Sequence, residues 1–209
     1  MCKSFKDHIN DFIKELLPSY CHCAECDSTT CEKCKDSDFE YKVYNEYSLQ
    51  YELGKYLSDN DYDVFYEKNV KEFLDEEDAD SCIKKEVDLI AVKDNKKYYA
   101  IELKFPKNGQ YPEQMKKFII DMCFMKQVKK YWRKKNKDAE TYCLTLVNDS
   151  KFYSNKSTAK KTLTTVRTLK TKGIYSFFRG EKNKPIYKQV IKWHHVPSKK
   201  LYYYFISMP

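Results

Sequence analysis

The chain has 209 residues and a net charge of +8, and its 42% hydrophobic content is enough to bury one sizeable core. It contains no apolar run of about 18 residues, and acidic residues break the N-terminal stretch where a signal peptide would be apolar, so we expect a soluble, cytoplasmic protein without a membrane segment. Nine cysteines in such a chain indicate reduced thiols or metal ligands rather than a disulfide framework.

The N-terminal part predicts a helix followed by a metal-binding element. Residues 3–17 place their apolar side chains on one helical face, and Pro18 ends the run. The segment CHCAECDSTTCEKC at 21–34 then holds two Cys-x2-Cys pairs, whose four thiolates fit a tetrahedral zinc. A segment of this length with so few apolar residues could hardly fold without a metal at its centre. The predicted zinc ligands are Cys23, Cys26, Cys31 and Cys34, with Cys21 as a substitute ligand. Free thiols or an iron-sulfur cluster are the alternatives.

The middle of the chain predicts an α/β core. Hydrophobic periodicity and turn residues give, in chain order, a helix at 43–58, a strand at 62–70, a loop at 73–81, two strands within 84–106 around a turn at 93–97, a helix at 112–135 and a strand at 141–147.

The C-terminal part is basic. Residues 151–209 hold 14 Lys or Arg against one acid, whereas residues 1–150 hold 25 bases and 30 acids. This asymmetry favours contact with a nucleic acid backbone, although Lys as ordinary polar filler is the alternative. We expect a loop with partial helix at 150–173 and a terminal hairpin within 187–208. The side chains that we predict to contact phosphate groups are Lys160, Lys161, Arg167, Lys170 and Lys172.

Three charged residues interrupt the apolar strands of residues 84–106. Side chains alternate along a strand, so Glu102 and Lys104 share one face, and pairing through the turn would bring Asp88 across from Glu102. Two neighbouring carboxylates repel each other unless a cation lies between them, and oxygen ligands favour Mg²⁺ or Mn²⁺. A lysine beside such a metal can orient or help deprotonate water and stabilise charge on a phosphoryl oxygen. The pattern predicts phosphodiester hydrolysis; an ordinary solvent-facing sheet surface is the alternative.

This pattern resembles the core of the PD-(D/E)xK nuclease superfamily, which includes restriction endonucleases and Holliday junction resolvases. Asp88 and the Glu102-Leu103-Lys104 segment match the motif, with Val87 in place of the proline, and the predicted order of elements from 43 to 147 matches as well. The superfamily also carries a glutamate on its first helix, for which Glu52 is the chosen match and Glu46 the alternative. Gln114 corresponds to a helical glutamine or lysine of several nuclease families.

The resemblance implies a restriction-endonuclease-like fold, in which helices flank a mixed central sheet. To this we add a small N-terminal zinc knuckle and a C-terminal β-hairpin. The expected domains are an N-terminal helix with the zinc element at 1–38, the nuclease core at 39–150 and the basic extension at 151–209.

The resemblance also implies an endonuclease that hydrolyses DNA with Mg²⁺ or Mn²⁺. Asp88 and Glu102 would bind the metal with the Leu103 carbonyl, Glu52 would hold a second metal or a metal-bound water, and Lys104 would position the attacking water. Cutting both strands of a duplex needs two active sites, which favours a homodimer. The competing hypotheses are a catalytically inactive, zinc-containing DNA-binding protein of the same fold and an enzyme directed at RNA.

Overall fold

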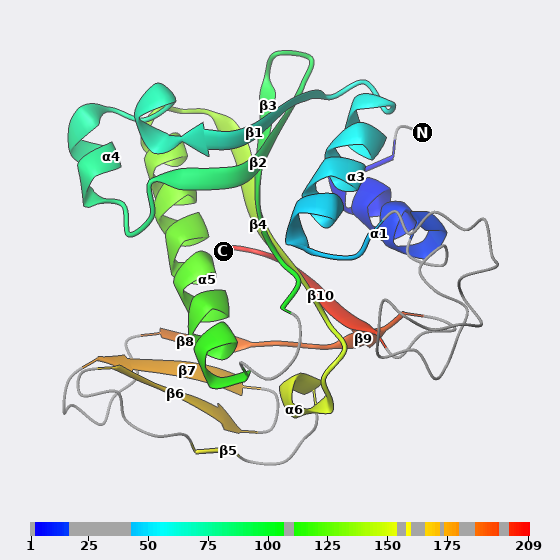
Figure 1. The fold of residues 1–209 in the computed structure, drawn as a ribbon. Coiled ribbons are helices and arrows are strands. Elements are labelled where there is room, and N and C mark those ends of the chain that lie inside the picture. Colours follow the sequence, from blue (N-terminus) through cyan, green and yellow to red (C-terminus); the bar gives the residue numbers. More distant parts are fainter. Residues whose placement is uncertain are drawn as a thin grey trace.

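The computed structural model describes residues 3–16, 43–106, 111–153, 158–159, 166–171, 174–179, 187–196 and 201–209. These residues form an α/β structure in which helices flank a mixed six-stranded sheet (Figure 1). The predicted α/β class is therefore confirmed. The predicted zinc ligands at 21–34 lie outside the described residues, as do Lys160, Lys161 and Lys172. Among the described helices, none is both long enough and apolar enough to cross a membrane.

The large sheet has the strand order β1-β2-β3-β4-β10-β9. All neighbouring strands are antiparallel except β3 and β4, which are parallel and joined by α5 (Tyr111–Lys134). A parallel pair needs such a crossover, and this helix supplies it. The strands are β1 (Asp63–Asn69), β2 (Glu86–Lys93), β3 (Lys97–Lys104), β4 (Asp138–Val147), β9 (His194–His195) and β10 (Tyr202–Ser207).

The predicted order of helix, strand, strand, strand, helix and strand is confirmed, beginning with α3 (Glu46–Ser58). The loop predicted at 73–81 is wrong in part, because η2 (Val70–Glu72) and α4 (Glu76–Ser81) lie between β1 and β2. Three acidic residues in the first turn of α4 favour a helix N-terminus there, and its one buried residue, Ala79, anchors the turn.

The C-terminal part differs more from the prediction. After α6 (Ser150–Tyr153), a second sheet has the order β5-β6-β7-β8, so the loop predicted at 150–173 is wrong over β6. Threonine, β-branched and aromatic residues favour strands in this region. Of the hairpin predicted at 187–208, only the pairing of β9 with β10 is confirmed, because β8 belongs to the second sheet. The strands are β5 (Thr158–Ala159), β6 (Val166–Thr171), β7 (Ile174–Arg179) and β8 (Tyr187–Val190).

The large sheet buries both of its faces. On one face, Leu89 and Ile101 pack under α3 and α1 (Phe5–Leu16), and on the other, Ile90 and Ala100 pack under α5 (Figure 1). The alternation along β2 and β3 therefore assigns each residue to one helix layer. It directs residues 88, 102 and 104 to the face that α5 covers.

Candidate active site

The structure brings together the three charges that interrupt β2 and β3. Leu89 pairs with Ile101 in the antiparallel register, so Asp88 is next in line with Glu102, on the face of the sheet that α5 covers. The Asp88 Oδ2 atom accepts a hydrogen bond of 2.7 Å from the Leu103 N–H and lies 3.9 Å from the Lys104 Nζ. The two acids therefore do not point to opposite sides of the sheet.

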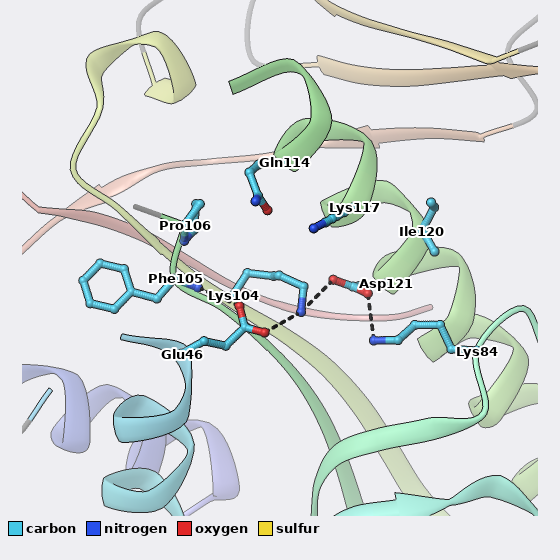
Figure 2. A pocket seen from close by; sticks show the side chains of 9 residues that line it. All are labelled: Glu46, Lys84, Lys104, Phe105, Pro106, Gln114, Lys117, Ile120 and Asp121. Carbon is cyan, nitrogen blue, oxygen red and sulfur yellow. Dashed lines mark hydrogen bonds and ion pairs between the residues drawn. The ribbon is translucent and has the colours of Figure 1, made fainter. Parts of the chain in front are cut away.

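Lys84 and Asp121 complete this cluster, and neither was predicted from the sequence. Lys84 lies just before β2, and its Nζ bonds to Glu102 Oε2 and, at 3.0 Å, to Asp121 Oδ1. Asp121 projects from α5, and its Oδ2 lies 3.6 Å from the Lys104 Nζ (Figure 2). The Asp121 carboxylate on α5 thus bridges the ammonium groups of Lys84 and Lys104.

Glu46 is the α3 residue that contacts the cluster. The Lys104 Nζ donates to Glu46 Oε1 at 3.0 Å, and Glu46 Oε2 accepts a 3.3 Å hydrogen bond from the Phe105 N–H. Glu46 is the first residue of α3, after an Asn45 N-cap, so the helix dipole also favours its charge. Glu52, the residue chosen from the sequence with Glu46 as its alternative, makes no hydrogen bond or ion pair with any described residue.

Helix geometry explains this difference between the two glutamates. Six residues along an α-helix rotate a side chain by about 240°, so Glu46 and Glu52 cannot point in the same direction. The N-terminal end of α3 lies next to the end of β3, which brings Glu46 within reach of Lys104 (Figure 2).

The backbone of Asp88 is held from the α3 side. Gln50, a buried residue of α3, donates from its Nε2 to the Asp88 carbonyl and, at 2.7 Å, to Glu67 Oε1. Glu67 has a φ of 46° and stands opposite Asp88 without pairing with it, while the register of β1 with β2 is the same on either side. The contacts of Gln50 therefore fix Asp88 relative to both α3 and β1.

Burial and like charge shift the pKa values of the acids upward. Burial, followed by repulsion from Asp88 and Asp121, raises the pKa of Glu102 well above its ordinary value. Burial also raises the pKa of Asp88 to about 6, although Lys104 and Lys84 oppose the shift. Both acids therefore hold protons more readily than a carboxyl group in water does.

The two lysines are shifted upward as well, for the opposite electrostatic reason. Burial alone would lower the pKa of Lys84 and of Lys104. The carboxylates around each ammonium outweigh that effect and raise both pKa values above the ordinary one, with Glu102 acting most strongly on Lys84 and Asp121 on Lys104. Both side chains carry their charge at neutral pH.

A cavity of about 520 Å³ opens beside the cluster, between the start of α3, the end of β3 and α5 (Figure 2). Ligand clefts commonly measure about 300–1,000 Å³. Gln114, predicted from the sequence as a helical site residue, lies on its wall. The lining residues are Glu46, Lys84, Lys104, Phe105, Pro106, Gln114, Lys117, Ile120 and Asp121.

The donor set fits a hard divalent cation, although the acids do not yet surround one point. In the described part of the chain, no three His, Cys, Asp or Glu side chains gather closely enough to hold a metal as they stand. The Leu103 carbonyl, a predicted ligand, accepts a 2.7 Å hydrogen bond from Lys104. Two buried oxygens, Glu102 Oε1 and Asp121 Oδ2, nevertheless have no hydrogen-bond partner among the residues that the structure describes, which is costly for a charged group.

The formal charge of the cluster points the same way. It combines four carboxylates with two ammonium groups, which gives −2 when all are ionised. A divalent cation would neutralise this excess and could bond the unpaired oxygens. The cluster therefore has the ligand chemistry that Mg²⁺ or Mn²⁺ requires, and it carries this charge once Asp88 and Glu102 have lost their protons.

One of the two missed residues has a signal in the sequence. Asp121 lies on the apolar stripe of α5, three residues after Phe118 and four before Met125, and it is only 3% exposed. A charge at a buried helix position is the same kind of interruption that singled out Asp88. Lys84 has no such signal, because it lies outside the strands and helices in a lysine-rich chain.

Comparison of the chain with protein-family models, with curated proteins and with solved structures found no match in any of the three.

Proposed function

We propose that the chain is a metal-dependent endonuclease of the PD-(D/E)xK type, which hydrolyses DNA phosphodiester bonds with Mg²⁺ or Mn²⁺. The observation that carries the proposal is the convergence of Asp88, Glu102 and Lys104 on one face of the sheet, beside an open cavity. The order of the core elements and the parallel pairing of β3 with β4 across α5 also support it.

Each residue has a distinct role in this proposal. Asp88 and Glu102 would hold the metal, which when bound activates water and offsets charge on the phosphate. In the metal-free chain Lys104 keeps its proton at neutral pH, because the acids around it outweigh the effect of burial and raise its pKa, so it is a hydrogen-bond donor there. It would orient the attacking water and stabilise a phosphoryl oxygen.

DNA is the proposed substrate because of the basic C-terminal part. Arg167 and Lys170 lie on β6, in the second sheet, which is next to α5, the helix that carries Asp121. A phosphate backbone could therefore extend from the cavity along this basic segment. Zinc at residues 21–34 and a homodimer remain predictions from the sequence.

Cleavage by the intact protein tests the proposal. Supercoiled plasmid and an RNA of similar length are incubated with the chain in Mg²⁺, Mn²⁺, Ca²⁺ or EDTA. We expect nicking of the plasmid in Mg²⁺ and Mn²⁺ and none in EDTA. Intact plasmid under every divalent metal, combined with tight, salt-sensitive binding, would instead identify the inactive DNA-binding protein. Preferential cleavage of the RNA would identify an RNA-directed enzyme.

The two glutamates of α3 give a matched pair for a second test. Glu46 contacts Lys104, whereas Glu52 has no partner among the described residues, so Glu46→Gln is expected to lower the cleavage rate about tenfold and Glu52→Gln far less. Single-turnover rates in Mg²⁺ measure both effects. A larger loss from Glu52→Gln would restore the assignment made from the sequence.

A further inference from the structure

We infer that Asp121 is a metal ligand and that the ammonium group of Lys84 fills the cation position between Glu102 and Asp121 in the metal-free chain. Lys84 then competes with the divalent metal from within the protein. This inference rests on the proposed function, because it concerns the same site, and it adds one ligand and one internal competitor to it.

The contacts of Lys84 mark the position. Its Nζ bonds to Glu102 Oε2 and lies 3.0 Å from Asp121 Oδ1, between two carboxylates whose side chains are 0% and 5% exposed. Glu102 comes from β3 and Asp121 from α5, so the ammonium joins the sheet to the helix. A cation at this point is surrounded by oxygens from two rigid elements, as a metal ion would be.

The ammonium leaves part of each carboxylate unsatisfied. Glu102 Oε1 and Asp121 Oδ2 are buried and have no hydrogen-bond partner within the described ranges. The described ammonium near Asp121 Oδ2 is that of Lys104, at 3.6 Å. Figure 2 shows Asp121 directed from α5 to the space between Lys84 and Lys104, on the wall of the cavity. A divalent ion carries twice the charge of an ammonium group and can bond more oxygens, so it suits these acids better.

Lys84 is the member of the group that can leave. Its side chain is 27% exposed, it lies just before β2, and it already lines the cavity, whereas Glu102 and Asp121 lie within a strand and a long helix. A long lysine side chain can move its ammonium into the cavity without a change in the fold. Metal binding therefore requires Lys84 to move and the two acids to stay.

Mn²⁺ binding to the full chain tests this arrangement independently of cleavage. The loss of the electron paramagnetic resonance signal of free Mn²⁺ measures the binding. We expect Lys84→Met to bind Mn²⁺ at least tenfold more tightly than the wild type, because the competitor is gone. Adding Asp121→Asn to Lys84→Met should weaken binding at least tenfold, since this second change removes a ligand without altering the competition. Lys85→Met is the matched control, because the Lys85 Nζ donates at 3.0 Å to the Ala79 and Asp80 carbonyls instead. Its affinity should equal that of the wild type.

Unchanged or weaker Mn²⁺ binding by Lys84→Met would overturn the inference, as would an Asp121→Asn change without effect in the Lys84→Met chain. If Lys84→Met does not fold without metal, Lys84→Gln takes its place, since it keeps a donor while losing the charge. If the variants bind Mn²⁺ as predicted but the wild type leaves plasmid intact, the proposed nuclease activity is refuted and this inference stands. Metal-dependent nicking by the wild type, combined with Mn²⁺ binding by Lys84→Met that is no tighter than that of the wild type, would refute this inference alone.

Discussion

Asp88→Asn and Lys104→Met are each expected to lower metal-dependent DNA cleavage about 1,000-fold or more. Asparagine keeps the shape of Asp88 and can still accept the hydrogen bond from the Leu103 N–H, but it lacks the charge that holds a metal. Methionine keeps most of the length of Lys104 and removes the ammonium that would orient water. Single-turnover cleavage of plasmid in Mg²⁺ measures both losses.

Two controls separate this loss from damage to the fold. Lys97→Met alters an exposed lysine at the other end of β3 and should leave the cleavage rate unchanged. Lys104 also pairs with Glu46, Asp88 and Asp121, so circular dichroism and thermal unfolding must show that Lys104→Met remains folded. Folded variants that nick plasmid within about threefold of the wild-type rate would place the active site elsewhere.

The second large effect concerns stability, because Asp88→Asn should make the metal-free protein more stable at neutral pH. The pKa of Asp88 is about 6 in the folded chain, against 3.8 for an ordinary aspartate. The folded state therefore binds this proton more tightly, and the stability of the wild type falls as the pH rises from about 4 to 6. At 1.36 kcal/mol for each pKa unit, the cost of the ionised carboxylate at pH 7 is about 3 kcal/mol.

Asparagine avoids this cost at every pH. The groups facing Asp88 are Lys104, Lys84, Asp121 and Glu102, and the loss of one negative charge also relieves the repulsion that raises the pKa of Glu102. Urea unfolding in EDTA between pH 4 and pH 8 measures the difference between the two chains. It should be near zero at pH 4 and reach its full value above about pH 6. A flat difference, or a less stable variant at pH 7, would show that the burial of Asp88 costs nothing.

The alternation of side chains explains why the centre of the site could be predicted from the sequence. A period of two fixes which face each residue of β3 occupies, so Glu102 and Lys104 follow directly from the spacing. The turn at 93–97 sets the register, which places Asp88 in line with Glu102. Local rules therefore suffice for residues on paired strands.

The partners that come from other elements could not be predicted in this way. The choice between Glu46 and Glu52 depends on how the start of α3 meets the end of β3, and Lys84 reaches Glu102 from the segment just before β2. Asp121 could be identified as a buried charge, but not its partners. The second sheet was missed for a related reason, since its strands are short and tertiary pairing decides their structure.

The central claim is that Asp88 and Glu102 hold one divalent ion beside Lys104. Crystals of the full chain soaked in Mn²⁺, with data collected at the manganese absorption edge, test it most directly. We expect an anomalous peak that marks a Mn²⁺ ion bonded to both carboxylates, on the face of the sheet covered by α5. The Lys84 ammonium should then be displaced into the cavity. Lysine–carboxylate pairs that stay intact at saturating Mn²⁺, with no peak between them, would contradict the account and leave the cluster as a buried network of ion pairs.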